Sequence, residues 1–378
     1  MSYPRVLVVY KSGRGPVFLG DRIRIESILA FLRKNQFDIV EAPLPSLAQL
    51  SFWQIVPSLF PLHGKVVPIL SRKALLLWLN LSASINSLKT IIRKTNPDIV
   101  LAETSLVGWI ATRVCTNYSI PCIIDAHGLA FAEARGVNYQ HWQYLKHLEE
   151  EAFLKCDHIL VVSKRMKRYV SKVFKINLDK ISVVPNGSTP QQFIAEYRIP
   201  LRVIYAGNLA YWEKVEDFLD IARQTTSYKF KFYLAGAGIL KNRLLERIRR
   251  ENIPLTYLGY ISRQKIFSVL STMQIGIAPS TKDLARVVAS PIKVFDYMAS
   301  GLPVITPKIG DWGEIIAEED CGIALEDDST ENYKEALNTL AQKDVWAIKS
   351  NNAINAIKRK YNWDNILKPL VDLIFNYQ

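Results

Sequence analysis

Short apolar runs alternate with helical segments along almost the whole chain. The runs are continuous rather than interrupted by polar residues, which is typical of parallel strands that helices cover on both faces. The first series spans 5–10, 37–42, 98–103, 121–127, 157–163 and 181–185, and the second spans 202–207, 230–236, 255–259, 275–279, 302–306 and 322–325. Strands that are each followed by a helix form a mostly parallel sheet with helices on its faces. The sequence therefore predicts an α/β protein made of two Rossmann-like halves.

The chain length of 378 residues also indicates two domains. Residues 188–200 show no sustained periodicity and separate the two series as a linker. We therefore expect an N-terminal domain over 1–190, a C-terminal domain over 200–360 and a closing segment over 361–378. That closing segment contains an amphipathic helix over 365–375.

The composition is that of a folded protein. With 49% hydrophobic and 22% charged residues the chain is able to bury two cores, and a disordered chain is excluded. The four cysteines show neither metal-ligand nor disulfide-framework spacing, which favours a reducing compartment. The N-terminus does not read as a signal peptide, and no apolar run approaches the roughly 20 residues of a membrane-spanning helix. We expect a cytoplasmic protein.

The positive charge of the chain is concentrated in its first half. The net charge is +13, of which +11 falls in residues 1–194 and +2 in residues 195–378. An anionic partner such as a membrane surface, a nucleic acid or a phosphorylated substrate would explain this, and so would a basic protein without such a partner. The basic helix expected over 164–173 is the best candidate for an anionic contact. It lacks the motif context of nucleic-acid modules, so no nucleic-acid partner is expected.

One further stretch, 43–81, combines tryptophans and a phenylalanine with interleaved basic residues. Such a composition fits an element that lies at a membrane interface. It fits equally well a helical hairpin that packs on the sheet while its basic side chains reach solvent.

A complete helix signal lies at 290–306, which reads SPIKVFDYMASGLPVIT. Ser290 is suited to cap the helix through its side-chain oxygen, and Pro291 suits the first helical position. Ile292 begins an apolar face, and Gly301 is suited to end the helix with a positive φ. A short buried strand follows.

The start of this helix is a candidate anion site. Its first amides have no partner within the helix, and such amides bind anions. Lys293 places a positive charge in the first turn, which is unfavourable for the helix unless an anion binds there. Asp296 lies one turn further on. This arrangement suits a nucleotide, with its diphosphate on the amides and its ribose hydroxyls on the carboxylate.

Two segments of the first half follow strands, where open α/β sheets place their ligands. The glycine-rich loop at 11–20 does not have the spacing of a dinucleotide fingerprint, which disfavours NAD. Asp125 and His127 end a later strand, and His127 is either structural or catalytic. No Asp-x-Asp pair ends a strand in the expected place, and no metal is expected.

Taken in order, these segments resemble the nucleotide-sugar-dependent glycosyltransferases with the two-domain GT-B fold, in particular the large group of retaining bacterial enzymes known as group 1 or family 4. VVPNG at 183–187 resembles the end of that family's N-terminal domain, and YAGNLAYWEKVEDFLDIA at 205–222 its first C-terminal βα unit. YLAGAG, LTYLGYIS, SPIKVFDYMASGLPVI and YNWDNIL follow in the expected order. The resemblance implies two domains that face each other across a cleft, and a C-terminal helix that crosses back to the N-terminal domain.

The resemblance also implies roles for individual residues. The catalytic set is His127, Lys214 and Lys293; the donor-binding set is Gly15, Asn208, Gly259, Tyr260, Ser290, Pro291, Ile292 and Asp296; the acceptor-binding set is Gly13, Arg14 and Asp125. Two positions depart from the family. Asn208 stands where the family has an arginine on the diphosphate, and Val288 stands where it has a glutamate that helps to hold the sugar.

The implied reaction is the transfer of a sugar from a nucleotide-sugar donor to an acceptor, with retention and without metal or cofactor. The basic first half indicates a lipid-linked or anionic glycan acceptor at the inner face of a membrane, as in polysaccharide biosynthesis. Two alternatives stay open. The changes at Val288 and Asn208 favour a non-catalytic binding or scaffold subunit, and the same fold also supports a nucleotide-sugar epimerase.

Overall fold

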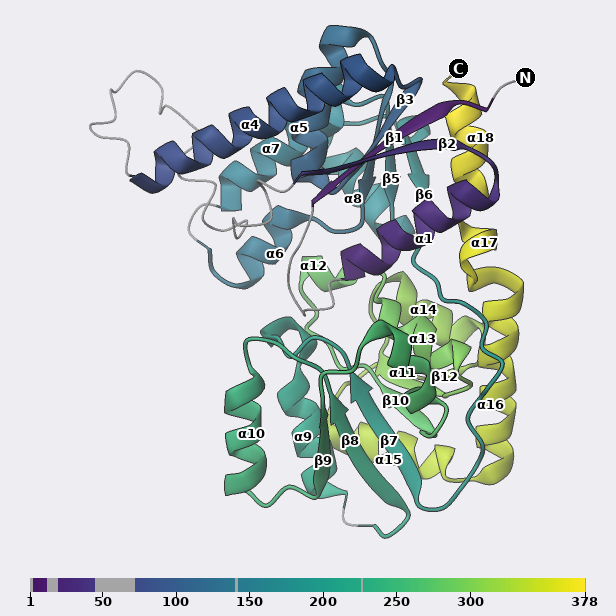
Figure 1. Ribbon diagram of the computed structural model, residues 1–378. Coiled ribbons are helices and arrows are strands. Elements are labelled where there is room, and N and C mark those ends of the chain that lie inside the picture. Colours follow the sequence, from purple (N-terminus) through teal and green to yellow (C-terminus); the bar gives the residue numbers. More distant parts are fainter. Residues whose placement is uncertain (1–2, 12–19, 45–71, 140–141, 226, 378) are drawn as a thin grey trace. The chain divides into compact units, whose positions relative to one another are not determined.

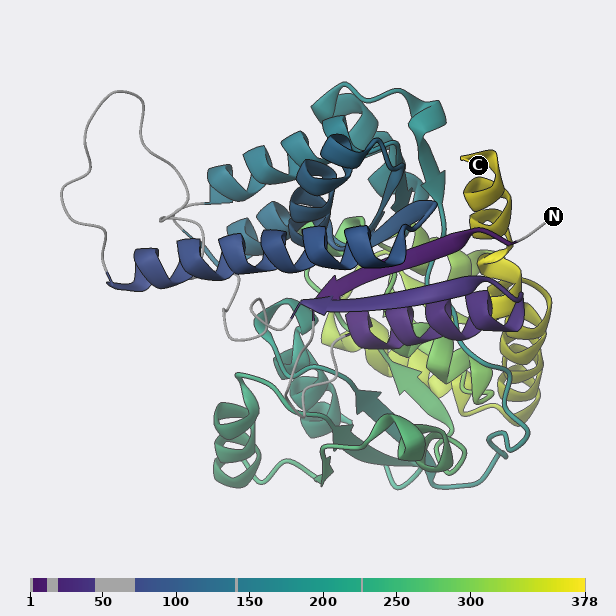
Figure 2. The same cartoon turned by 45° about the horizontal axis from the view of Figure 1, so that its top comes forward.

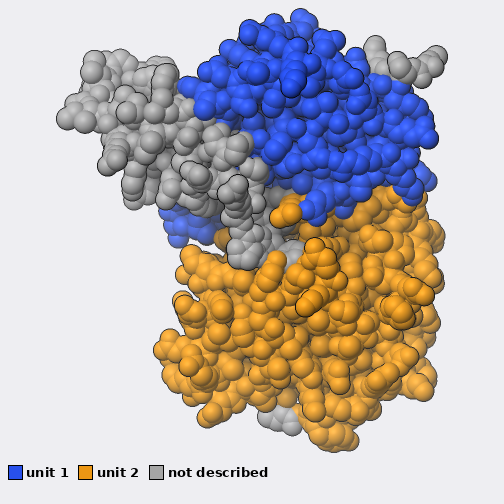
Figure 3. All heavy atoms as spheres, viewed as in Figure 1, with its two compact units in different colours: residues 1–16, 25–184, 367–378 blue, residues 17–24, 185–366 orange. Residues whose placement is uncertain are grey.

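The computed structural model describes all residues except 1–2, 12–19, 45–71, 140–141, 226 and 378 (Figure 1). The chain divides into two compact units, which Figure 3 shows in different colours. Unit 1 comprises residues 1–16, 25–184 and 367–378, and unit 2 comprises residues 17–24 and 185–366. Each unit is built around a parallel six-stranded sheet, so the predicted α/β class is confirmed.

The sheet of unit 1 has the strand order β2-β1-β3-β4-β5-β6. Its strands are β1 (Arg5–Lys11), β2 (Asp38–Leu44), β3 (Ile99–Glu103), β4 (Cys122–Ala126), β5 (His158–Val161) and β6 (Ile181–Val183). All neighbours pair in parallel, and β3 and β4 are buried throughout. This burial explains why the strands read as continuous apolar runs.

The helices of unit 1 lie between these strands in the chain, except for the last one, which ends it; residues 20–24 at the start of the first helix belong to unit 2. They are α1 (Gly20–Lys34), α4 (Arg72–Thr95), α5 (Ser105–Cys115), α6 (Ala130–Gly136), α7 (Trp142–Lys155), α8 (Lys164–Phe174) and α18 (Lys368–Asn376). Helix α6 was not predicted. The stretch 43–81 lies mostly outside the described residues, and its last part is the beginning of α4. No described helix has both the length and the apolar character needed to cross a bilayer.

The sheet of unit 2 has the strand order β12-β11-β10-β7-β8-β9. Its strands are β7 (Leu201–Ala206), β8 (Phe230–Ala235), β9 (Leu255–Gly259), β10 (Ile275–Ile277), β11 (Val304–Pro307) and β12 (Gly322–Leu325). Its helices are α9 (Val215–Gln224), α10 (Lys241–Arg250), α11 (Arg263–Leu270), α12 (Leu284–Val287), α13 (Ile292–Ala299), α14 (Gly310–Glu318), α15 (Thr330–Leu340), α16 (Lys343–Ala356) and α17 (Trp363–Ile366). Both sheets reverse their strand order beside their first strand, between β1 and β3 and between β7 and β10.

The C-terminal helix α18 packs within unit 1, as predicted. Leu370 and Ile374 are buried, and the Tyr377 hydroxyl donates to the Asp157 carbonyl oxygen at 2.9 Å. The ring of Phe375 lies 5.6 Å from that of Phe37. Figures 1 and 2 show α18 beside the beginning of β1. The single helix predicted over 365–375 is wrong in one respect, because the chain forms two short helices there, α17 and α18.

Candidate donor site

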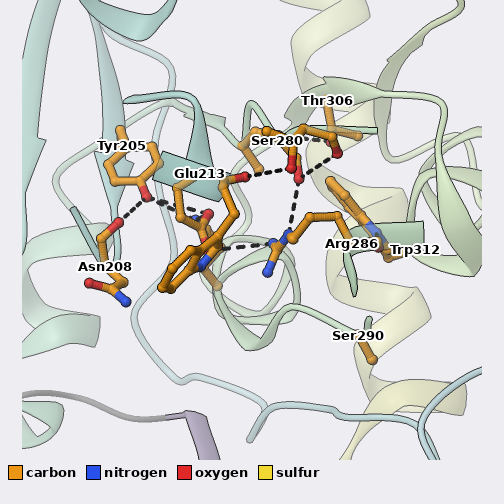
Figure 4. Close-up of polar contacts among 12 residues, drawn as sticks. Tyr205, Asn208, Glu213, Ser280, Arg286, Ser290, Thr306 and Trp312 are labelled. Carbon is orange, nitrogen blue, oxygen red and sulfur yellow. Dashed lines mark hydrogen bonds and ion pairs between the residues drawn. The ribbon is translucent and has the colours of Figure 1, made fainter. Parts of the chain in front are cut away.

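Polar residues gather in unit 2 where its sheet reverses strand order. The segment 207–214 follows β7, and the segment 278–290 follows β10. Open α/β sheets bind ligands at the carboxyl ends of strands at such a reversal. Figure 4 shows Glu213 from the first segment and Arg286 from the second pointing toward each other. This edge of the sheet is the candidate donor site.

Glycines allow the loops after β7 and β8 to approach closely at this edge. Gly236 has a φ of +143°, and a Cβ there would lie 1.9 Å from the Gly207 carbonyl oxygen. Hydrogen bonds then continue beyond the strands, with Leu209 N donating to Ala237 O at 2.9 Å and Gly236 N donating to Gly259 O at 2.8 Å. A side chain at position 236 would force the two loops apart.

Three charged side chains lie together, largely buried, beside these loops. Lys293 Nζ forms an ion pair with Glu213 and lies 3.1 Å from the Tyr205 hydroxyl, while Arg286 Nη2 lies 3.4 Å from Glu213 Oε1. The side chains of Lys293, Arg286 and Glu213 are only 12%, 13% and 7% exposed. We call these three residues, together with Tyr205, the Glu213 cluster. One carboxylate faces two cations, so the cluster carries a net positive charge.

Burial and neighbouring charges shift the pKa values within the Glu213 cluster. Burial alone would raise the pKa of Glu213, but Arg286 and Lys293 outweigh it and hold that pKa below its ordinary value. Burial is the main cause that lowers the pKa of Lys293; Arg286 adds to this effect and Glu213 opposes it. Burial also raises the pKa of Tyr205, so its hydroxyl stays neutral. Glu213 is therefore ionised, and Arg286 and Lys293 both pair with its carboxylate.

Arg286 is held from both its backbone and its side chain. Its carbonyl oxygen accepts from Trp312 Nε1 at 3.2 Å, and its Nε donates to Ser280 Oγ at 3.0 Å (Figure 4). The Asp283 side chain caps α12 by accepting from the Arg286 amide at 3.2 Å. These contacts direct the guanidinium toward Glu213.

The sequence reasoning missed both Arg286 and Glu213. Helix α12 has only four residues, too few to show a periodic pattern, and Glu213 is 80 residues away from its partner Lys293. The one available signal was the position of Arg286 between a buried strand and the helix at 290–306.

Lys214 follows Glu213 directly but has different partners. Its Nζ lies 3.1 Å from Asp217 Oδ2 and 3.1 Å from Asp328 Oδ2. Burial alone would lower its pKa, but the two carboxylates outweigh burial and hold the pKa above its ordinary value. The structure therefore does not bring Lys214 and Lys293 to a common carboxylate.

The predicted cap of the helix at the site is wrong. Helix α13 begins at Ile292 and its N-cap residue is Pro291, which makes no side-chain cap. The Ser290 hydroxyl instead accepts from the Asn186 amide at 3.1 Å, and the Ser290 carbonyl accepts from Asn186 Nδ2 at 2.6 Å. The sequence could not show this because Asn186 lies 104 residues earlier. The predicted end of the helix is confirmed, since Gly301 has a φ of +75°.

Asp296, the predicted ribose ligand, is buried on α13 and already has two partners. Arg263 pairs with both of its oxygens, with Nη2 lying 3.1 Å from Oδ1. The Ser188 hydroxyl donates to the same Oδ1 at 2.6 Å. The carboxylate therefore connects α13 with the start of α11 and with the segment after β6, and a ribose would have to share it.

The remaining predicted donor residues follow β7 and β9. The backbone oxygen of Asn208 accepts from the Tyr205 hydroxyl at 2.7 Å. The Asn208 side chain packs against Gly238, where a Cβ would lie 2.6 Å from its Oδ1. Gly259 ends β9 with a φ of +75°, and the neighbouring Tyr260 is exposed.

In unit 1 the structure brings Asp125 and His127 together at the carboxyl end of β4. His127 Nδ1 lies 3.8 Å from Asp125 Oδ2, and both side chains are largely buried. Asp125 is paired in register with the buried Glu103 of β3. Gly13, Arg14 and Gly15 lie outside the described residues.

The segment that follows His127 is held by a buried carboxylate of α7. Glu149 accepts from Ser105 Oγ at 2.7 Å, Ala130 N at 2.8 Å and Phe131 N at 3.1 Å. It thereby caps α6 and links it to α5. Burial raises the pKa of Glu149 to about 7. In the described part of the chain no group of three or more His, Cys, Asp or Glu residues is placed to hold a metal ion.

Comparison with known proteins identifies the class of both halves. The model "Glycosyltransferase Family 4" matches residues 61–192, and the model "Glycosyl transferases group 1" matches residues 200–343. The chain therefore belongs to the group 1 and family 4 glycosyltransferases, as the resemblance implied, and it is an enzyme of the GT-B fold.

Individual relatives are distant in sequence. An uncharacterized glycosyltransferase of Methanocaldococcus jannaschii is 22% identical over 71% of this chain and 72% of its own. The UDP-Gal:alpha-D-GlcNAc-diphosphoundecaprenol alpha-1,3-galactosyltransferase of Escherichia coli is 24% identical over 78% of this chain and 80% of its own. The structure of a sucrose-phosphate synthase from Thermosynechococcus elongatus has a TM-score of 0.79 at 14% identity, covering 98% of this chain and 99% of that one.

Proposed function

We propose that this glycosyltransferase transfers a sugar from a nucleoside-diphosphate sugar to a lipid-linked or otherwise anionic glycan. The observation that carries the proposal is the buried Lys293 in the first turn of α13, next to the reversal of strand order in unit 2. An anion at this helix terminus is favoured by the lysine and by the helix amides together. The Escherichia coli relative supports such a donor, because its name specifies UDP-Gal.

In the proposed reaction the bond between the sugar carbon and the diphosphate oxygen breaks. A bond forms from that carbon to an acceptor hydroxyl, on the same face of the sugar, so the configuration is retained. The hydroxyl proton passes to the leaving diphosphate. Negative charge develops on the leaving group, and fixed cations and amides stabilise it electrostatically. Lys293 and Lys214 supply cations at this edge, so the proposal uses no metal.

Asp296 would accept a ribose hydroxyl while keeping its contact with Arg263. A carboxylate has about four acceptor positions, and three are engaged by Ser188 and Arg263. In unit 1, the His127–Asp125 pair is proposed to face the acceptor, since it ends a strand of the other sheet.

The proposed acceptor class is inferred from the positive net charge of residues 1–194. Helix α8 is capped by Ser163, whose Oγ accepts from Met166 N at 2.9 Å, and it buries Met166, Val170 and Phe174. Its other faces carry Lys164, Arg165, Lys167, Arg168 and Lys172. We propose that this basic surface meets an anionic membrane at its cytoplasmic face. The name of the Escherichia coli relative, which specifies a diphosphoundecaprenol acceptor, supports the choice.

The test is a transfer assay with a panel of nucleotide sugars and lipid-linked acceptors. Wild-type protein should form product with one donor class. Lys293→Ala and Lys214→Ala should each lower turnover by at least roughly tenfold, because each removes a cation from the charge developing in the transition state. Lys241→Ala, on the exposed start of α10, is the matched control and should be unaffected. Wild-type turnover in both lysine variants would refute the phosphate assignment.

One position of the candidate donor site departs from the family pattern in a way that bears on sugar recognition. Val288, at the position of the expected acid, is buried and its amide donates to Leu284 O at 3.1 Å at the end of α12. The position therefore offers no carboxylate to a sugar.

A further inference from the structure

The position of Arg286 calls for a ligand beyond Glu213. Arg286 comes from the segment after β10 and Glu213 from the segment after β7, so the two meet where the sheet reverses its order. Two cations with one carboxylate leave a buried net positive charge there. Buried charge of one sign is costly unless an opposite charge comes close.

The guanidinium also has donors left for such a ligand. Nε donates to Ser280 and Nη2 faces Glu213, whereas among the described residues no acceptor is recorded for Nη1. A guanidinium binds phosphate oxygens through two parallel N–H groups, which a single ammonium group is unable to do. Lys293 lies on the other side of Glu213 and supplies such an ammonium group.

We propose that Arg286 is a donor-binding residue that, with Lys293, holds the diphosphate of the nucleotide sugar. Glu213 keeps the two cations in place. The diphosphate binds the N–H groups of Arg286 and Lys293 that do not face Glu213. Arg286 thus supplies the charge that Asn208 does not. The inference rests on the proposed function, because it names the contacts that the donor makes at the same site.

The experiment is a calorimetric titration of the protein with UDP, with GDP, ADP and dTDP in parallel, and separately with uridine. Arg286→Gln keeps a hydrogen-bond donor for Ser280 but removes the charge. It should weaken UDP binding by roughly tenfold to hundredfold, the usual cost of one hydrogen bond to a charged group, while uridine binding stays unchanged. Arg243→Gln is the matched control. This arginine pairs with Glu216 at the surface and is 65% exposed, so its UDP affinity should equal that of the wild type.

Two outcomes separate this inference from the proposed function. If wild-type protein binds neither UDP nor the GDP, ADP and dTDP used in parallel, the proposed function fails and the inference fails with it. If the wild type binds a diphosphate and Arg286→Gln binds it equally well, only the inference is overturned, and the Glu213 cluster is an internal ion pair.

Folding of the variant is checked by thermal denaturation. Should Arg286→Gln not fold, Arg286→Lys decides the question, because it retains the charge but not the planar pair of donors. A UDP affinity several times weaker than wild type supports the inference, and wild-type affinity overturns it.

Discussion

At the residue scale, the clearest consequence concerns the buried Glu149. Its pKa in the folded chain is about 7, above the ordinary value of 4.5. Between these values the folded state holds a proton that the unfolded state has lost, so stability must fall as the pH rises from about 4.5 to 7. The stabilisation by protonated Glu149 is complete below a pH of 4.5, the pKa of this group in the unfolded chain. It is lost once the pH exceeds about 7, the pKa in the folded chain.

We therefore expect Glu149→Gln to remove part of the pH dependence. Glutamine resembles the protonated acid and does not titrate. Relative to wild type, the variant should gain about 2–3 kcal/mol in free energy of unfolding between pH 5 and pH 8, since each pKa unit corresponds to about 1.4 kcal/mol. Urea denaturation at both pH values measures this. Glu150→Gln, on the same helix, is the control, and an identical pH profile for Glu149→Gln and wild type would contradict the assignment.

The Arg263–Asp296 pair leads to a second prediction at this scale. Asp296 is buried and contacts both Arg263 and Ser188. Arg263→Ala should destabilise the protein more than Asp296→Asn does, because it leaves a buried carboxylate without its cation. A double-mutant cycle should give a coupling free energy of about 1–3 kcal/mol. Additive effects of the two substitutions would show that the pair contributes nothing.

At the element scale, the strands were predictable and the contacts between loops were not. Most strands are short, largely apolar runs, and local sequence is enough to find them. The helix α13 was found from Pro291 and Gly301, which act locally. Its cap was wrong because Asn186 takes the Ser290 hydroxyl. Partners that are distant in sequence leave no local pattern, so propensity arguments do not find them.

The joined loops after β7 and β8 are a testable feature at the same scale. In Gly236→Ala the new Cβ would lie 1.9 Å from Gly207 O, at a φ that only glycine adopts readily. This substitution should cost at least about 3 kcal/mol in free energy of unfolding, from backbone strain and the steric clash together.

Gly259→Ala is the matched control for this prediction. Gly259 also has a positive φ, but among the described residues no atom outside its chain neighbours lies within 4 Å of a Cβ there. It should cost only about 1–2 kcal/mol, the strain of a left-handed residue. Both values come from urea denaturation, and equal costs for the two variants would show that the close approach of the loops is unimportant.

At the scale of the whole molecule, sequence was enough for the fold class, for the return of the last helix to unit 1 and for the enzyme class. It was not enough for the charges of the candidate site. Lys293 and Asp296 were both found, yet the partners that define their chemistry, Glu213 and Arg263, were not. Each partner comes from a different loop at the edge of the sheet, and only the folded chain brings them together.

The central claim is that unit 2 binds a nucleoside-diphosphate sugar at the carboxyl edge of its sheet. Thermal denaturation of the full-length chain with UDP-, GDP-, ADP- and dTDP-sugars tests it most directly. Ligand at 100 times its Kd stabilises the folded state by about 2.7 kcal/mol. For a unit of this size we therefore predict a saturable rise in Tm of roughly 5–10 °C with one nucleotide class. Lys293→Ala should lose most of that rise. No shift with any of the four at millimolar concentration, or an equal shift in Lys293→Ala, would contradict the account.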